Sequence, residues 1–226
     1  MLVDKFLNLE GPAPPLGKAA SYSKSASKKS LDFLAAILGS AVLFPFLLLI
    51  AAAIKLDSKG SVLFRQKRVG RDGKIFNILK FRTMISNADN TIHEHHIHSY
   101  AMGLLDGTDG YKYKDDPRIT RVGKFLRNTS IDELPQLWNV IRGEMSIVGP
   151  RPVPVYEADF HNLWQNERLE VLPGITGLWQ VLGRSSVSMD DQIRLDIRYI
   201  RHQSFWLDIK IILATILCAL SARGAG

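Results

Sequence analysis

Cysteine is almost absent from this sequence, because Cys218 is the single one in 226 residues. One cysteine cannot close an intramolecular disulfide or supply a cysteine-based zinc site. Negative charge is also scarce, since 29 Lys and Arg residues outnumber 22 Asp and Glu residues and leave a formal net charge of +7. A basic chain attracts polyanions such as nucleic acid, anionic lipid headgroups or phosphorylated metabolites. Composition alone does not choose among these partners.

The N-terminal region lacks the apolar core that a cleavable signal peptide carries. Residues 1–30 end in the Ser/Lys-rich stretch SYSKSASKKS, which predicts a disordered basic tail. The sequence has no internal repeat, and 226 residues suffice for one well-cored domain but are marginal for two. We therefore expect a single domain after this tail.

Charge is absent from one long run, FLAAILGSAVLFPFLLLIAAAI at residues 33–54. The run reaches the roughly 20 residues that span the hydrocarbon core of a bilayer. Basic residues flank both of its ends, so the positive-inside bias draws both ends toward the cytoplasm. Pro45 lies at its middle, where proline removes a backbone hydrogen bond at a cost of about 3 kcal/mol. We predict a re-entrant helix-break-helix over residues 31–59, with a simple span or a buried core helix as alternatives.

A second apolar run, FWLDIKIILATILCAL at residues 205–220, is shorter and carries Asp208 and Lys210. Aromatic residues at its start suit the headgroup boundary, so the run predicts an interfacial amphipathic helix. A helix packed into the protein core is an equally open interpretation.

The body of the chain predicts an α+β fold that is mostly helical, with a small β-hairpin. The stretches at residues 61–70 and 74–84 have strand character and are joined by the turn GRDG. Apolar residues then recur at spacings of three and four, which predicts an amphipathic helix. These apolar positions are Ile131, Leu134, Leu137, Trp138 and Ile141.

Residues 91–116 are polar, interrupted by glycines and rich in histidine. The histidine spacing matches neither the HExxH helix face nor a zinc-finger pair. We therefore interpret this stretch as a surface excursion without a metal site.

Two adjacent carboxylates, Asp132 and Glu133, lie in TSIDELPQLWNV, within the most basic part of the chain. Ser130 and Glu133 fit a capping box. Asp132 also fits as an N-cap, because it would place Pro135 in the first helical turn. The start of a helix is therefore one interpretation of the pair.

Phosphate chemistry is the other interpretation. Basic residues precede the carboxylates and follow them beside glycines: Arg118, Arg121, Lys124, Arg127, Arg151 and Arg184. Arginine binds phosphate in a bidentate fork, and a helix N-terminus favours anions. Carboxylates repel phosphate, so carboxylates within a phosphate site need a function of their own. They can bind Mg²⁺ together with phosphate oxygens, or act as a nucleophile that forms an acyl phosphate.

Three stretches after the apolar run carry a family resemblance: KFRTM, DPRITRVGKFLRNTSIDELPQLWNVIRGEMSIVGPRP and ITGLWQVLGR. Over about residues 28–220 the chain resembles the bacterial sugar transferases, which are monotopic polyprenyl-phosphate phosphoglycosyltransferases. In that family a membrane-resident enzyme moves a sugar-1-phosphate from a nucleotide sugar to polyprenyl phosphate. The resemblance implies an exopolysaccharide-type undecaprenyl-phosphate hexose-1-phosphate transferase. Its donor would be a UDP-sugar such as UDP-galactose or UDP-glucose, and its product would start exopolysaccharide or another surface glycan.

The resemblance also implies roles for particular residues. Asp132 would be the nucleophile that carries the phosphosugar, and Glu133 would help to hold Mg²⁺ or assist proton movement. Both carboxylates are the expected Mg²⁺ ligands. The basic positions expected at the substrate phosphates, with one acidic position of the same site, are Lys80, Arg127, Arg151, Arg184 and Asp196.

The implied organisation is a catalytic domain over residues 60–226 on the cytoplasmic face of the bacterial inner membrane. UDP-sugar, polyprenyl phosphate and downstream glycosyltransferases are the implied partners, a homo-oligomer is compatible with them, and nucleic acid is not expected. A non-catalytic membrane-surface module that binds anionic lipid or nucleic acid is the alternative, although it gains nothing from Asp132 and Glu133 among its cations. A glycosyltransferase that moves the sugar without its phosphate is a further alternative, and it would release nucleoside diphosphate.

Overall fold

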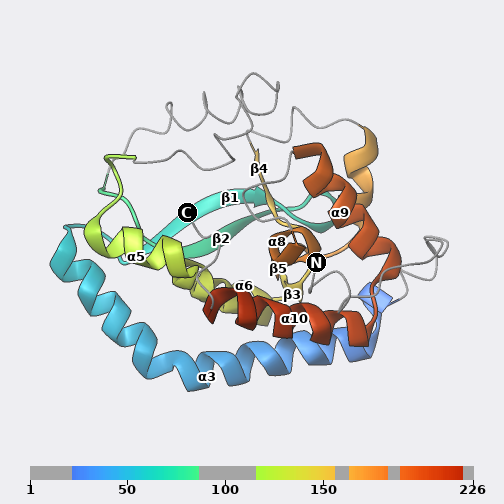
Figure 1. Cartoon of the computed structure of the whole chain (residues 1–226), viewed down its shortest axis with the longest axis horizontal. Coiled ribbons are helices and arrows are strands. Elements are labelled where there is room, and N and C mark those ends of the chain that lie inside the picture. Colours follow the sequence, from blue (N-terminus) through green and yellow to red (C-terminus); the bar gives the residue numbers. More distant parts are fainter. Residues whose placement is uncertain (1–21, 87–115, 156–162, 183–188, 221–226) are drawn as a thin grey trace.

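The computed structural model describes residues 22–86, 116–155, 163–182 and 189–220. Most of its regular structure is helical, which confirms the predicted mostly helical α+β class (Figure 1). The helices are α3 (Ala26–Asp57), α5 (Arg121–Thr129), α6 (Leu137–Ile141), α8 (Leu178–Leu182), α9 (Met189–His202) and α10 (Phe205–Leu220). Short 3₁₀ segments are η1 (Arg71–Gly73), η2 (Ile131–Gln136) and η3 (Leu163–Glu170).

The predicted hairpin is confirmed. Strands β1 (Leu63–Val69) and β2 (Ile75–Phe81) pair antiparallel, with Leu63 opposite Phe81 and Val69 opposite Ile75. In the turn between them, Gly73 adopts a φ of 73°, which costs glycine little. The strand β4 (Val153–Pro154) pairs with the other edge of β1. Strands β3 (Ser146–Val148) and β5 (Gly174–Thr176) form a separate parallel pair.

Helix α3 is the one described helix that is long and apolar enough to cross a membrane. The Ser25 side chain accepts a hydrogen bond from the Lys28 amide and caps the helix start. Residues 26–30 are therefore helical, which corrects the tail boundary predicted at residue 30. Pro45 lies inside the helix, and the helix continues through it, so the predicted interruption is not observed. Figure 1 instead shows α3 bending near its middle, and a helix with an internal proline commonly kinks.

A buried polar network joins the start of α3 to the core. Lys28 Nζ donates to Asp208 Oδ2 at 2.6 Å, to Asp32 Oδ1 at 3.3 Å and to the Val148 carbonyl at 3.2 Å. The Tyr199 hydroxyl donates to Asp208 Oδ1 at 2.7 Å and lies 3.1 Å from the same Val148 carbonyl. Asp208 is fully buried, so it is not the interfacial charge that the sequence suggested.

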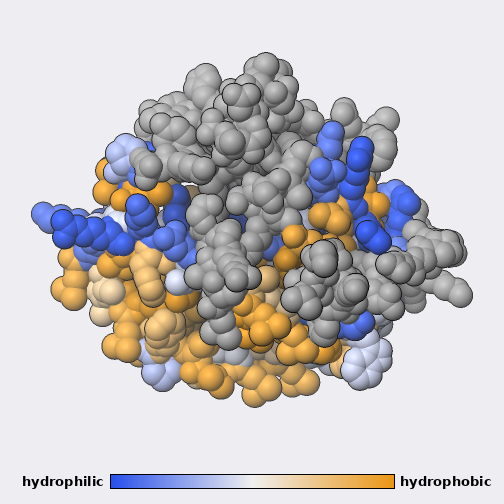
Figure 2. Space-filling view, in the orientation of Figure 1, coloured by the Kyte–Doolittle hydropathy of each residue, from blue (hydrophilic) through white to orange (hydrophobic). Residues whose placement is uncertain are grey.

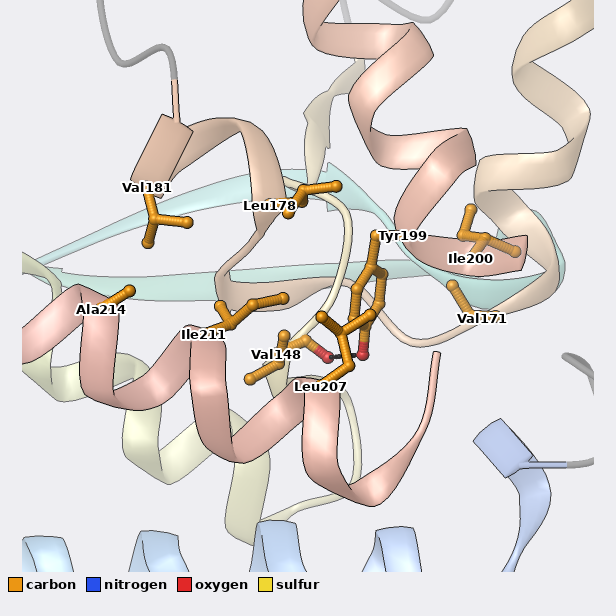
Figure 3. Close-up of a cluster of buried hydrophobic side chains, with 9 residues drawn as sticks. All are labelled: Val148, Val171, Leu178, Val181, Tyr199, Ile200, Leu207, Ile211 and Ala214. Atoms are coloured by element: carbon orange, nitrogen blue, oxygen red, sulfur yellow. Dashed lines mark hydrogen bonds between the residues drawn. The ribbon is translucent and has the colours of Figure 1, made fainter. Parts of the chain in front are cut away.

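The largest apolar core lies between α8, α9, α10 and strand β3 (Figure 3). Helix α10 contributes Leu207 and Ile211 to this core and leaves Trp206 and Leu217 exposed. One face of this helix therefore packs inward, as the core interpretation predicted, while the other is apolar and exposed, and the interfacial interpretation stays a prediction. Figure 2 shows hydrophobic residues gathered on the lower face of the molecule, over α3 and α10.

The predicted amphipathic helix at residues 131–141 forms in a different way. Its first part is the 3₁₀ segment η2, which contains Pro135, and only its last five residues form α6. Its polar residues Gln136 and Asn139 are buried, whereas Trp138 is half exposed. Leu137 packs near Ala36 of α3 in a second apolar cluster. The apolar positions therefore face α3 and the surface, while the polar positions face the hairpin.

Candidate functional site

The chain reverses direction just before the two carboxylates. Helix α5 ends at Thr129, and Ser130 takes the left-handed conformation with φ 57° and ψ 16°. Within the described part of the chain the Ser130 side chain makes no capping hydrogen bond, and Asp132 lies inside η2 rather than before it. Both capping interpretations are therefore wrong. A left-handed backbone conformation costs a residue other than glycine about 1–2 kcal/mol. The surrounding structure must therefore maintain this turn.

Glu133 is held between two of the predicted basic residues. Lys80 Nζ, on β2, donates to Glu133 Oε1 at 2.7 Å, and Arg151 Nη1 donates to the same oxygen at 3.4 Å. All three side chains are partly buried, so their attraction is screened less than that of a surface ion pair. The structure thus brings together residues that are 53 and 18 positions apart in sequence.

The charge of Asp132 interacts with that of Arg127, another of the predicted basic residues. Only 9% of Asp132 is exposed, and the segment η2 that carries it packs against β2 and α5. Burial lowers the pKa of the Arg127 guanidinium, and the negative charges of Asp132 and Asp116 oppose that shift. Arg127 Nε donates to Thr83 Oγ1 at 2.9 Å, which restrains the guanidinium.

The predicted acidic residue Asp196 lies on α9. Its carboxylate is fully buried, with Arg168 Nη2 at 2.9 Å from Oδ2. Arg168 also donates to the Arg151 carbonyl at 3.0 Å. Burial raises the pKa of Asp196 to about 7, while Arg168 and a hydrogen bond from the Arg151 backbone act in the opposite direction. The position favours a role in supporting the Arg151 backbone over direct contact with a substrate.

In the KFRTM stretch, Arg82 and Thr83 make structural contacts in addition to those of Lys80. Arg82 Nη2 donates to the Ser58 carbonyl at 2.7 Å and lies 3.4 Å from the Ile54 carbonyl, so it caps the C-terminal end of α3. Thr83 accepts the bond from Arg127, and its carbonyl accepts from the Thr120 amide at 3.0 Å. Sequence reasoning assigned only Lys80 here. The sequence offers one signal for the roles of Arg82 and Thr83, namely that both belong to the KFRTM stretch.

Arg184 and the histidines of residues 91–98 lie outside the described residues. Within the described ranges, no group of three His, Cys, Asp or Glu side chains could hold a metal ion. Asp132 and Glu133 still fit Mg²⁺, because this ion commonly takes one or two carboxylates and completes its octahedron with water and substrate phosphate. Glu133 would exchange part of its contact with Lys80 and Arg151 for the ion.

Comparison with known proteins places the chain in a family. The family model for bacterial sugar transferases matches residues 23–222. Galactosyl transferase CpsE of Streptococcus agalactiae is 43% identical over 209 residues, which are 92% of this chain and 45% of that protein. Exopolysaccharide production protein ExoY of Sinorhizobium fredii is 41% identical over 199 residues, which are 88% of each chain.

A third relative is the UDP-glucose:undecaprenyl-phosphate glucose-1-phosphate transferase of Caulobacter vibrioides, with 42% identity over 223 residues, 95% of this chain and 76% of that protein. The chain spans less than half the length of the streptococcal relative and of a UDP-galactose-lipid carrier transferase from Erwinia amylovora. The match over residues 23–222 covers the helices, the hairpin and the paired carboxylates described above. The chain therefore belongs to the bacterial sugar transferase family.

Proposed function

We propose that this chain transfers a sugar-1-phosphate from a UDP-sugar to undecaprenyl phosphate or a similar polyprenyl phosphate, and so starts exopolysaccharide or another surface glycan. The names of its relatives support this class of reaction, since several are undecaprenyl-phosphate galactose or glucose phosphotransferases. The observation that carries the proposal is that Lys80 and Arg151 hold Glu133 directly beside the buried Asp132 in the chain.

The transfer takes two displacements at one phosphorus atom. First, a carboxylate oxygen of Asp132 bonds to the phosphorus that bears the sugar, and the bond to the bridging oxygen breaks, so nucleoside monophosphate leaves with that oxygen. Second, a phosphate oxygen of the polyprenyl phosphate bonds to the same phosphorus, and the Asp132 oxygen leaves as a carboxylate. The product is a lipid diphosphate sugar. Neither step needs a proton from the protein, because both nucleophiles react as anions.

The basic residues offset the repulsion between the buried carboxylates and the negatively charged phosphates of the substrates. Arg127 interacts electrostatically with Asp132, and its positive charge favours the ionised carboxylate that attacks. Lys80 and Arg151 hold Glu133 and place two cations where phosphate oxygens arrive. Mg²⁺ held by Asp132 and Glu133 would supply further neutralisation of phosphate charge.

The membrane placement that we propose is re-entrant, with the catalytic domain on the cytoplasmic face of the inner membrane. Both ends of α3 are fastened to the same catalytic body, through Lys28 at its start and through Arg82 at its end. A straight helix of 32 residues is about 48 Å long, more than the roughly 30 Å of bilayer hydrocarbon. A bent helix whose two ends meet one body favours entry and exit at one face.

The reaction is tested with membranes that contain the full chain, radiolabelled UDP-galactose or UDP-glucose, Mg²⁺ and undecaprenyl phosphate. We expect labelled lipid and release of nucleoside monophosphate. Asp132→Asn should lower turnover by at least about a thousandfold, because amides are poor nucleophiles. Asp190→Asn, at an exposed position of α9, is the control for a lost carboxylate.

Three outcomes would refute the proposal. Unchanged turnover in Asp132→Asn removes the nucleophile. Release of nucleoside diphosphate indicates transfer of the sugar without its phosphate. Binding of the membrane without any turnover of either donor favours the non-catalytic surface module.

A further inference from the structure

Helices α3 and α5 enclose an open groove of about 440 Å³ on the apolar side of the molecule. One wall consists of α3 residues at spacings of three and four, which include Phe46, Leu49 and Ile50, and the other includes Phe125 and Leu126 of α5. Phe46, Leu49 and Phe125 are among the exposed large hydrophobic residues. A groove of this size is within the range of small-molecule sites, and its walls suit a hydrocarbon chain.

One cation interrupts this apolar lining. Arg121 lines the groove, whose described lining is otherwise apolar. Along α5 it begins a stripe of basic residues at a spacing of three, Arg121, Lys124 and Arg127. The charge of the last of these interacts with that of Asp132. The groove therefore has the chemistry of a site for an amphiphile with a hydrocarbon chain and an anionic head.

Two lining residues of the groove also belong to an apolar cluster that includes a residue adjacent to the carboxylates. Ile50 and Leu126 belong to an apolar cluster that includes Ile131 of η2. Ile131 immediately precedes Asp132. The apolar cluster that contains two of the groove's lining residues thus also contains the residue next to the proposed nucleophile.

We propose that the groove between α3 and α5 binds the acceptor, with its isoprenoid chain between Leu49 and Phe125 and its phosphate on the stripe that ends at Arg127. This inference rests on the proposed function, because polyprenyl phosphate is the lipid that must reach Asp132. An ordinary phospholipid would fill the apolar walls equally well, but it has no reaction to undergo at the carboxylate.

Two leucines on α3 provide a matched test. Leu49 is 70% exposed and lines the groove, whereas Leu48 is 55% exposed and does not line it. Leu49→Gln should raise KM for long-chain polyprenyl phosphate about tenfold relative to KM for a short isoprenyl phosphate. Leu48→Gln should leave both KM values as in the wild type. Equal effects of the two substitutions, or an effect of Leu49→Gln that does not depend on chain length, would overturn the proposal.

Photolabelling of the unmodified protein gives a second readout that does not depend on a variant. A polyprenyl phosphate with a diazirine in the isoprene unit nearest the phosphate should label peptides from residues 46–53 or 121–126. Unlabelled polyprenyl phosphate should prevent the labelling, and phosphatidylglycerol should not. Equal protection by phosphatidylglycerol would mean that the groove holds ordinary membrane lipid, and labelling of other peptides alone would place the acceptor elsewhere.

The groove and the transfer mechanism fail in different ways. Wild-type enzyme with donor alone should release nucleoside monophosphate in an amount that matches the enzyme. If no such release occurs, the two-displacement mechanism is wrong. If it occurs while KM in Leu49→Gln is independent of acceptor chain length, the mechanism stands and the groove assignment is wrong.

Discussion

Lys28 Nζ and Asp208 Oδ2 lie 2.6 Å apart in the interior of the protein, although 180 residues separate them in sequence. The pair joins the first turn of the apolar helix α3 to the last helix α10. Lys28 also bonds to the Val148 carbonyl, three residues before Arg151 of the candidate site. The start of α3 and the segment that carries Arg151 are therefore joined by one hydrogen-bond network.

Removal of the Lys28 charge should destabilise the fold. Lys28→Met leaves Asp208 and Asp32 buried beside an apolar side chain, and breaking a buried ion pair on one side costs about 3–5 kcal/mol. Lys29→Met is the control, because Lys29 is exposed on the neighbouring position. Thermal unfolding of the detergent-solubilised chain should show a clear loss for the first variant and a change within about 0.5 kcal/mol for the second. Equal melting temperatures would show that the network contributes nothing.

Asn139 should be as important to the fold as an apolar core residue. It is fully buried, accepts a hydrogen bond from the Leu79 amide at 3.0 Å and donates to the Asn77 carbonyl at 2.8 Å. Asn139→Leu keeps the branched shape of the side chain but leaves these backbone groups of β2 without partners, at about 1–3 kcal/mol for each group. Chemical denaturation measures the loss, with the exposed Asn128→Leu as control. A variant as stable as the wild type would contradict the claim that the hydrogen bonds of Asn139 stabilise the contact between α6 and the hairpin.

Asp196 predicts a specific dependence of stability on pH. Because burial raises its pKa to about 7, the folded state binds more protons than the unfolded state between about pH 4 and pH 7. This group's contribution to the free energy of unfolding is therefore largest at low pH and falls as pH rises through that window. Asp196→Asn lacks the titration, so its stability relative to the wild type should increase from pH 5 to pH 7.5. Parallel curves for the two proteins would contradict the raised pKa, and the exposed Asp190→Asn should give parallel curves.

The path of α3 can be tested with single cysteines in a Cys218→Ser background. Lys29→Cys and Lys59→Cys lie near the two ends of the helix at exposed positions. Gly60 is unsuitable, because its φ of 121° and its closeness to Arg82 leave no room for a side chain. A re-entrant helix predicts that an impermeant thiol reagent reaches both cysteines from the cytoplasmic side. Access to the two cysteines from opposite sides would establish a span.

The sequence predicted the parts of the fold that depend on local pattern. Alternation and the GRDG turn were enough for the hairpin, and the residues expected at the phosphates include Lys80 and Arg151, which meet at Glu133. The face of residues 131–141 was harder to assign. Its apolar residues Leu137 and Ile141 pack toward α3, but the polar residues Gln136 and Asn139 are buried as well, which an apolar pattern does not predict.

Long-range pairs were beyond the reach of local pattern. Lys28 looked like one more charge in a basic tail, and Asp208 like a charge at the headgroup boundary. Only the fold brings them together and buries both. The capping interpretation of Asp132 failed for a related reason, since Ser130 adopts a left-handed conformation that residue type alone does not predict.

The central claim is that Asp132 becomes covalently attached to a phosphorylated sugar. It is tested most directly by mass spectrometry of the enzyme incubated with donor and Mg²⁺, quenched before acceptor is added. We predict that the peptide containing Asp132 gains the mass of the sugar phosphate, and that Asp132→Asn does not. Wild-type enzyme without this mass, together with release of nucleoside monophosphate only when polyprenyl phosphate is present, would contradict the account.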